Sequence, residues 1–152
     1  MKSDSKLRLR LWLQLARTVL PLSRIIDGRF RQRFGQSLVR FDAMSQLARH
    51  VNGLQTGQLA DRMLAATSGN ITMLLHRMAR EGLVERRASP EDGRVSLIFL
   101  TDSGRELFTQ MAVAQEAWVN EIFEDLEEGQ VRQLANDLSL VAEDAKRPEP
   151  EV

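Results

Sequence analysis

The chain has no cysteine and only two histidines, His50 and His76, among its 152 residues. Without thiols it cannot hold a disulfide framework, a thiolate zinc site, a cysteine nucleophile or a thiol redox switch. Two imidazoles are too few for an ordinary transition-metal site made of protein side chains alone. We therefore expect neither a metal nor a cofactor.

Long apolar segments are also missing from the sequence. No run approaches the ~18–20 residues that cross a bilayer, and no signal-peptide pattern opens the chain. A hydrophobic content of 43% is nevertheless enough for a packed core. These features predict a cytoplasmic protein of one domain, or of one domain with added helices, that does not engage membranes.

The usual signs of catalysis are absent as well. The sequence contains no paired nucleophile and base, no phosphate loop of the Walker type and no cluster of metal ligands. We therefore expect that the protein is not an enzyme.

The net charge is zero, because 21 basic side chains balance 21 acidic ones. The balance is uneven along the chain: residues 1–50 carry +8, residues 51–100 carry +1, and residues 101–152 carry −9. Such asymmetry is compatible with a basic binding surface followed by an acidic tail, and equally with two helical segments that pair. Charge alone does not decide between these interpretations.

Apolar residues at helical spacing predict helices over residues 7–34, 40–51, 57–64, 68–81, 101–126 and 128–145. Thr56 is the expected N-cap of the third helix, and Thr67 or Ser68 that of the fourth. Pro21 predicts a kink or a short break near Leu20. Residues 1–6 and 146–152 are expected to be loose.

Two strand-like runs, residues 83–87 and 95–100, flank a segment rich in turn formers and predict a hairpin. The expected fold class is therefore mainly α with a small β-hairpin wing, an α+β arrangement. Its centre is a winged helix-turn-helix core, and its long terminal helices are too apolar to stand without a partner.

The fourth predicted helix is the candidate DNA-reading element. Its first turn is small and polar, and helix N-termini attract phosphate through unpaired N–H groups and partial positive charge. Asparagine pairs with adenine, arginine with guanine, and methyl-bearing side chains contact thymine. Together with the start of the preceding helix, the predicted DNA-contacting residues here are Thr56, Ser68, Gly69, Asn70, Thr72, Met73 and Arg77.

The hairpin tip is a second candidate DNA contact. Arg94 at such a tip suits a narrow minor groove, where the negative potential is strongest. Asp92 is an unexpected acid at this place, and we predict that it pairs with Arg94 or Arg87 to orient the guanidinium. Arg86 and Arg87 alternate across the strand, so that one faces phosphate while the other covers the edge of the core. Arg87 and Arg94 are the predicted DNA-contacting residues of the wing.

The stretch from Thr56 to Gly104 resembles the winged-helix core of the MarR family of bacterial transcription regulators. The resemblance rests on residues 57–60, 68–72 and 77–86, and above all on the Asp-x-Arg wing, Asp92 to Arg94, followed by Leu-Thr-x-x-Gly, Leu100 to Gly104. Residues 41–47 are similar to the family's second helix. With the long terminal helices, the similarity covers nearly the whole chain.

The resemblance implies an obligate homodimer, with a dimerisation helix at residues 1–35, a DNA-binding core at 36–101, dimerisation helices at 102–145 and a loose tail at 146–152. The protein would be a repressor that binds double-stranded DNA at a near-palindromic operator, and it would lie on the bacterial nucleoid when bound. The alternative is a winged-helix module that binds protein instead of DNA, which the zero net charge favours.

The resemblance also implies release from DNA by a small anionic aromatic ligand, as in the branch that senses aromatic acids, urate or aromatic CoA thioesters. The expected ligand-binding residues are Trp12, Arg17, Arg40, Phe41 and Met44. The chain departs from the family at Pro21, inside the helix that would line the pocket, and at Gly93, where many relatives carry arginine. Lack of cysteine excludes the thiolate peroxide sensors, and scarce histidine disfavours the zinc sensors.

Overall fold

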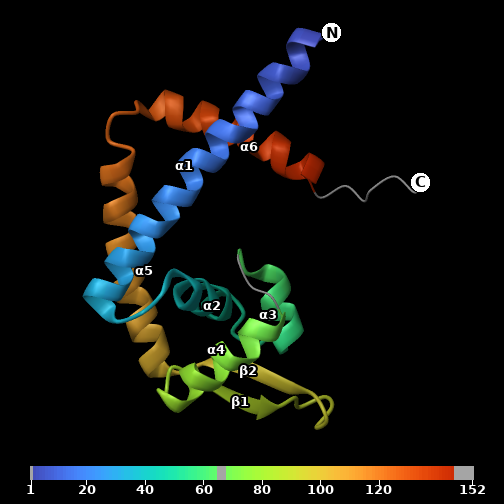
Figure 1. The fold of residues 1–152 in the computed structure, drawn as a ribbon. Coiled ribbons are helices and arrows are strands. Elements are labelled where there is room, and N and C mark those ends of the chain that lie inside the picture. The colour runs from blue at the N-terminus through green and yellow to red at the C-terminus, as the bar shows by residue number, and fades with distance from the viewer. Residues whose placement is uncertain (1, 65–67, 146–152) are drawn as a thin grey trace, which may run out of the picture. The chain divides into compact units, whose positions relative to one another are not determined.

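The computed structural model describes the backbone of residues 2–64 and 68–145 and, within them, the side chains of residues 6–64 and 70–142. Six helices and a two-stranded antiparallel hairpin occupy these ranges (Figure 1), which confirms the predicted fold class. The elements are α1 (Lys2–Phe34), α2 (Leu38–Arg49), α3 (Thr56–Arg62), α4 (Ser68–Arg80), β1 (Val84–Ala88), β2 (Ser96–Leu100), α5 (Asp102–Ile122) and α6 (Glu128–Ala145).

The first helix differs from the prediction in two ways. It begins at Lys2, so the expectation of a loose start is wrong for residues 2–6; once a helix has nucleated, each added residue costs little. It also continues through Pro21 without a break. Proline lacks the N–H that would bond to the Arg17 carbonyl, and its ring crowds that carbonyl. Because Arg17 and Pro21 are both exposed, water can satisfy that carbonyl.

The ends of the next helices are set by local capping. Ser37 caps α2 by accepting from the Arg40 N–H at 3.2 Å. The N-cap of α3 is Gln55, and not Thr56 as predicted; the Gln58 side chain accepts from the Gln55 N–H at 3.0 Å. The predicted cap Thr67 lies outside the described residues, and α4 begins at Ser68.

The wing pairs Val84 with Leu100 at its base and Ala88 with Ser96 near its tip. Leu54, in the turn before α3, forms an isolated antiparallel bridge with β2 by exchanging two backbone hydrogen bonds with Ile98, at 3.1 and 2.8 Å. Gly53 makes this approach possible. It has a φ of +80°, and a Cβ there would lie 2.7 Å from the Phe99 ring. The wing is thereby joined to the helix-turn-helix.

A hydrophobic core joins the C-terminal end of α1 to the winged helix-turn-helix. Phe41 stacks on Phe30 on one side, at 4.8 Å between ring centroids, and on Phe108 on the other, at 5.4 Å. The largest fully buried side chains come from α1, α2, α3, α4, β2 and α5: Phe30, Met44, Leu47, Leu59, Ile71, Leu75, Met78, Ile98 and Met111. Packing against these residues fixes the position of α4.

The chain divides into two compact units, with the boundary inside α5 between Gln115 and Glu116. The first unit contains the winged helix-turn-helix and its core. In the second, the Gln130 side chain accepts from the Glu127 N–H at 2.9 Å at the start of α6. None of the described side chains of the second unit, residues 116–142, is buried.

The start of α5 is fastened to the turn between α4 and β1. The Thr101 hydroxyl donates to the Gly82 carbonyl at 2.6 Å and accepts from the Gly104 N–H at 3.0 Å, and the Thr101 N–H donates to the Leu83 carbonyl at 3.1 Å. A Cβ at Gly104 would lie 2.1 Å from the Leu83 oxygen. The Leu-Thr-x-x-Gly segment is therefore a structural joint between the long helix and the base of the wing.

Replacing Gly104 with alanine should destabilise the protein, because the methyl group has no space beside the Leu83 carbonyl. We expect a loss of about 1–3 kcal/mol in the free energy of unfolding, the usual range for overpacking. Urea denaturation measures this loss. Gly129→Ala is the matched control, since no atom lies within 4 Å of the position that its methyl group would take; equal stability of the two variants would contradict the account of the joint.

Candidate nucleic-acid interface

One face of α4 is buried in the core and the opposite face is exposed. Ile71, Leu75 and Met78 are at most 1% exposed, so the helix cannot rotate without uncovering them. At about 100° per residue, the side chains of Asn70, Met73 and Arg77 fall outside this buried sector. All three are exposed, and Met73 exposes 56% of its surface although it is apolar.

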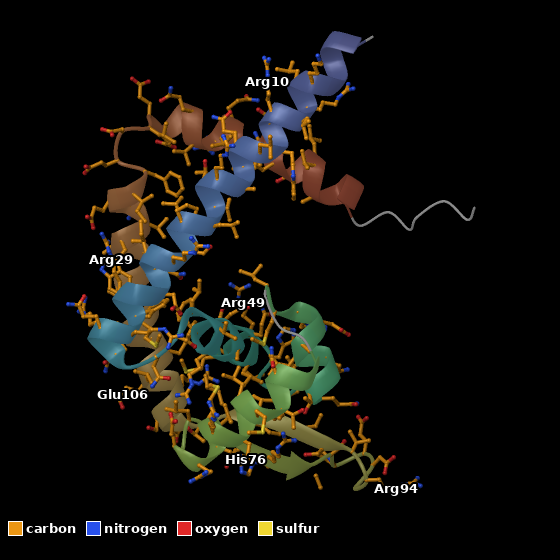
Figure 2. All side chains as sticks on the ribbon, viewed as in Figure 1. Arg10, Arg29, Arg49, His76, Arg94 and Glu106 are labelled. Atoms are coloured by element: carbon orange, nitrogen blue, oxygen red, sulfur yellow. The ribbon has the colours of Figure 1, made fainter. Side chains whose placement is uncertain are left out.

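The exposed face contains a basic residue that the sequence prediction missed. Arg80 follows Met73 by seven residues, which is two helical turns or about 10.5 Å along the axis. It is exposed, as is His76, which lies on α4 in Figure 2. The i, i+7 spacing from Met73 to Arg80 was the signal that could have identified it. Thr72 is exposed on the other flank of the same face.

The backbone geometry at the start of the candidate reading helix suits an anion. The helix begins at Ser68, so its first N–H groups lack intrahelical partners. The side chains of Ser68 and Gly69 lie outside the described set. Thr56, the first residue of α3, is half-buried, and its assignment to DNA stays a prediction.

At the hairpin tip, Asp92 contacts Arg94 in two ways. Its Oδ1 accepts from the Arg94 backbone N–H at 3.0 Å and from the Arg94 Nε at 3.3 Å. The Asp92 carbonyl also accepts from the Val95 N–H at 2.9 Å, closing the turn. The Arg94 side chain is 92% exposed, and Figure 2 shows it at the end of the hairpin. The sequence predicts that Asp92 pairs with Arg94 or with Arg87, and in the structure it pairs with Arg94.

Arg87 lies elsewhere on the wing. It pairs with Glu85 and places its guanidinium over the Phe99 ring, 4.8 Å from the centroid. Strand register puts these three residues on one face of the hairpin and Arg86 on the face that carries Val84 and Ile98. The Arg87 guanidinium thus covers the apolar Phe99 ring, while the Arg86 side chain is exposed on the opposite face of the hairpin.

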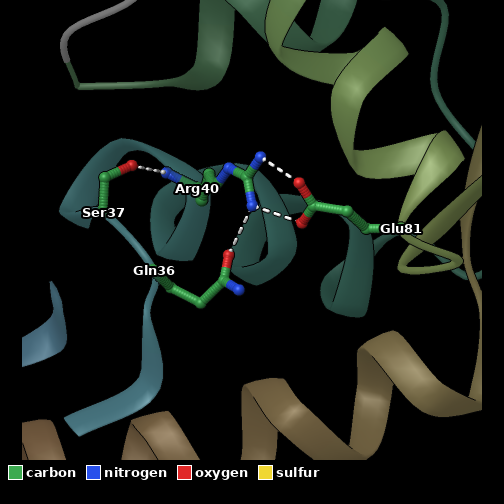
Figure 3. Close-up of polar contacts among 4 residues, drawn as sticks. All are labelled: Gln36, Ser37, Arg40 and Glu81. Atoms are coloured by element: carbon green, nitrogen blue, oxygen red, sulfur yellow. Dashed lines mark hydrogen bonds and ion pairs between the residues drawn. The ribbon is translucent and has the colours of Figure 1, made fainter.

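The C-terminal end of α4 is tied to α2 by an ion pair (Figure 3). The two guanidinium nitrogens of Arg40 donate to the two carboxylate oxygens of Glu81, at 2.5 and 2.8 Å, and one also donates to Gln36 at 2.9 Å. The hydrogen bond from Arg40 lowers the pKa of the Glu81 carboxyl, and the charges of Arg40 and Arg77 act in the same direction against a smaller effect of burial.

The five predicted ligand-binding residues do not line a common pocket within one chain. Phe41 and Met44 are core residues, and Arg40 binds Glu81. Trp12 is 64% exposed on α1. It precedes Phe30, the residue that stacks on Phe41, by eighteen positions, which is about 27 Å along a helix. Arg17 is exposed on the same distant half of α1.

Two further features bear on function. In the described ranges no group of three or more histidine, aspartate or glutamate side chains is placed to hold a metal ion. None of the helices over residues 2–64 and 68–145 combines the length and the apolar character that a membrane span requires.

Comparison with known proteins identifies the family. Residues 34–95 match the model of the MarR family. The chain is 30% identical over 105 residues to the HTH-type transcriptional regulator MhqR of Bacillus subtilis, a match that covers 69% of this chain and 72% of MhqR. The chain belongs to the MarR family. It is also 34% identical over 76 residues to the HTH-type transcriptional repressor IacR of Pseudomonas putida, and this match spans 50% of the chain but only 46% of IacR.

Solved structures of MarR-family proteins share the fold. A MarR family transcriptional regulator from Silicibacter pomeroyi superimposes with a TM-score of 0.80 at 27% identity, over 94% of this chain and 98% of that one. A MarR mutant from E. coli, crystallised with operator DNA, gives a TM-score of 0.76 at 20% identity, over 87% and 93%. These MarR-family relatives are transcriptional regulators and not enzymes.

The Arg40–Glu81 ion pair should make stability depend on acid pH. Because the folded-state pKa of Glu81 lies below its unfolded value, the pair stabilises the fold above about pH 4.5 and loses this effect as the pH falls through the folded-state pKa. We expect Glu81→Gln to be less stable than the wild type at pH 7, and we expect the difference to shrink as the pH falls below about 4.5. Urea denaturation at pH 7 and pH 3 measures this, and a difference that persists unchanged at pH 3 would argue against the ion pair.

Proposed function

We propose that this MarR-family protein is a homodimeric, DNA-binding transcriptional repressor that acts in the cytoplasm on chromosomal DNA. The observation that carries the proposal is the combination of the exposed face of α4 with an arginine held at the wing tip. A reading helix and a wing together contact two grooves of a duplex. The DNA complex of a protein with the same fold supports this assignment.

The residues divide by the kind of contact they offer. Asn70, Thr72 and Met73 are exposed on the first half of α4 and are suited to base edges in the major groove. The N-terminus of α4 and Arg80 are suited to backbone phosphates. Arg94 reaches beyond the body of the protein toward the minor groove, with its direction set by Asp92.

The proposal of a dimer rests on apolar surface that one chain leaves uncovered. The N-terminal half of α1 exposes Leu9, Leu11, Trp12 and Leu13, each by 42–64%. On α6 the exposed apolar side chains are Val131, Leu134, Leu138, Leu140 and Val141. Exposed apolar patches of this kind, on each helix taken by itself, mark association surfaces in soluble proteins, and a second copy of the chain would provide matching ones.

We further propose that repression responds to a small anionic aromatic ligand. Trp12 and Arg17 offer a stacking face and a cation on α1, and both are exposed. Since Phe41 and Met44 are buried in the same chain, the remaining walls of such a pocket would come from the second copy. Repression itself is supported by the similarity to IacR, which is named a repressor.

Replacing Arg94 with alanine tests the DNA-binding role of the wing. We expect weaker binding to every duplex and a salt dependence of log affinity that is shallower by about one, because one phosphate-proximal charge is lost. Fluorescence anisotropy with operator and random duplexes at several salt concentrations measures both quantities. Arg132→Ala removes another exposed arginine, from α6, and is the control. Identical slopes for the wild type and Arg94→Ala would reject the assignment.

A further inference from the structure

A polar hollow lies where the end of α1, the start of α2 and the C-terminal part of α4 meet. Its volume is about 660 Å³, and we call it the corner hollow. The charged and polar side chains that line it are Arg31, Gln36, Ser37, Arg40, Arg77 and Glu81. Three arginines, Arg31, Arg40 and Arg77, therefore line one cavity of the first unit together with a single carboxylate, that of Glu81.

The three arginines are not equally engaged. Arg31 donates from Nε to Asp27 at 2.6 Å, at the edge of the hollow. Arg40 binds Glu81 with both nitrogens. The guanidinium of Arg77 has no hydrogen-bond partner among the described residues, and it acts on Glu81 through charge alone. The corner hollow consequently offers the N–H donors of Arg77, which are unused, as well as an excess of positive charge.

The Glu81 carboxylate already binds Arg40 in the corner hollow, as an anionic ligand would. Its carboxylate makes the bidentate contact with arginine that phosphate groups also make. The Glu81 side chain is 46% exposed, whereas that of Arg40 is 14% exposed, so the acid is the partner that can swing into solvent. An incoming oxyanion would replace the Glu81 carboxylate at the Arg40 guanidinium, which the fold already holds in position.

We propose that the corner hollow binds a phosphate group, which contacts Arg40 and Arg77 and displaces Glu81 from Arg40. The Gln36 side chain accepts at 2.9 Å from one of the two Arg40 nitrogens that bind Glu81, and it keeps the guanidinium in the hollow after the exchange (Figure 3). The phosphate belongs either to a free small molecule or to the DNA backbone; both present the same oxygens. This role for Arg77 differs from the base contact that the sequence predicts.

Phosphate binding would act on the reading helix through Glu81. This residue directly follows Arg80, the last residue of α4, and its bond to Arg40 links segments 41 residues apart in the chain. Losing that bond releases the C-terminal end of α4 from α2. Because binding equilibria that share a conformational change are reciprocal, phosphate and operator DNA would then influence each other. This second step rests on the proposed DNA-binding function, whereas the phosphate site does not.

Titration with inorganic phosphate at constant ionic strength tests the site directly. We expect saturable shifts of the backbone amides of residues 36–40 and 77–81 and of the Arg40 side chain in two-dimensional NMR spectra of the full chain. Arg77→Gln should weaken binding by about threefold, as expected for one exposed ion pair, and Glu81→Gln should tighten it by about the same factor. Arg40→Gln should abolish it, and Arg132→Gln should change nothing.

Shifts that do not saturate, that spread over all basic surfaces, or that are unaltered in both Arg77→Gln and Glu81→Gln would overturn the proposal. The variants Arg77→Gln and Glu81→Gln change exposed residues, so they keep the test valid if Arg40→Gln does not fold.

Titrations of operator DNA then distinguish the two possible sources of the phosphate. A DNA phosphate predicts a salt slope lower by about one in Arg77→Gln, while a free phosphate predicts that added phosphate weakens operator binding in the wild type only. Failure of the wild type to bind any duplex would reject the proposed function and leave the NMR result intact.

Discussion

The burial of one face of α4 is the constraint on which the rest of the structure depends. Ile71, Leu75 and Met78 complete the core formed with Phe30, Met44 and Ile98. Rotating or withdrawing the helix would expose three large apolar side chains, at a cost of about 1.5–3 kcal/mol each. The polar face of α4 is therefore held toward solvent by the core, and the surface proposed to read DNA is pre-formed.

A few polar contacts surround this core and fix the neighbouring elements. Asp42 accepts from the Leu64 N–H at 2.6 Å after α3, the Thr101 hydroxyl fastens α5 to the turn at Gly82, and Arg40 holds Glu81 beyond the end of α4. Each links segments that are distant in sequence. The contacts of Asp42 and Arg40 involve charged groups, and such hydrogen bonds are among the stronger ones in proteins. Together the three contacts position α4 and the wing relative to the helices around them.

Patterns that are local in sequence predicted the structure well. Apolar spacing identified α2, α4, α5 and α6 to within a few residues. The Pro-Glu-Asp-Gly-Arg run predicted the hairpin tip and a pairing of Asp92 with Arg94 or Arg87, of which the structure has the first. Of the kink or short break predicted at Pro21, the break is absent, because a single missing N–H at an exposed position does not end a helix that long. The N-cap at Gln55 was missed because glutamine is an uncommon capping residue.

Contacts between distant segments could not be predicted in the same way. Nothing in the sequence near Arg40 indicates that Glu81 lies beside it. An apolar residue on a helix gives the same sequence pattern whether it faces a core or a ligand, so the sequence alone does not show that Phe41 and Met44 are buried in the core. The bridge between Leu54 and Ile98 also depends on the tertiary fold, since Leu54 stands alone between two helices.

The central claim is that two copies of this chain read a symmetric DNA site through α4 and the wing. Footprinting on the DNA upstream of its own gene tests this most directly. The account predicts two protected half-sites related by a near-palindrome, with centres about one helical turn, or about 10 base pairs, apart. The absence of any protected palindrome at moderate salt would contradict it and favour a winged-helix module that binds protein.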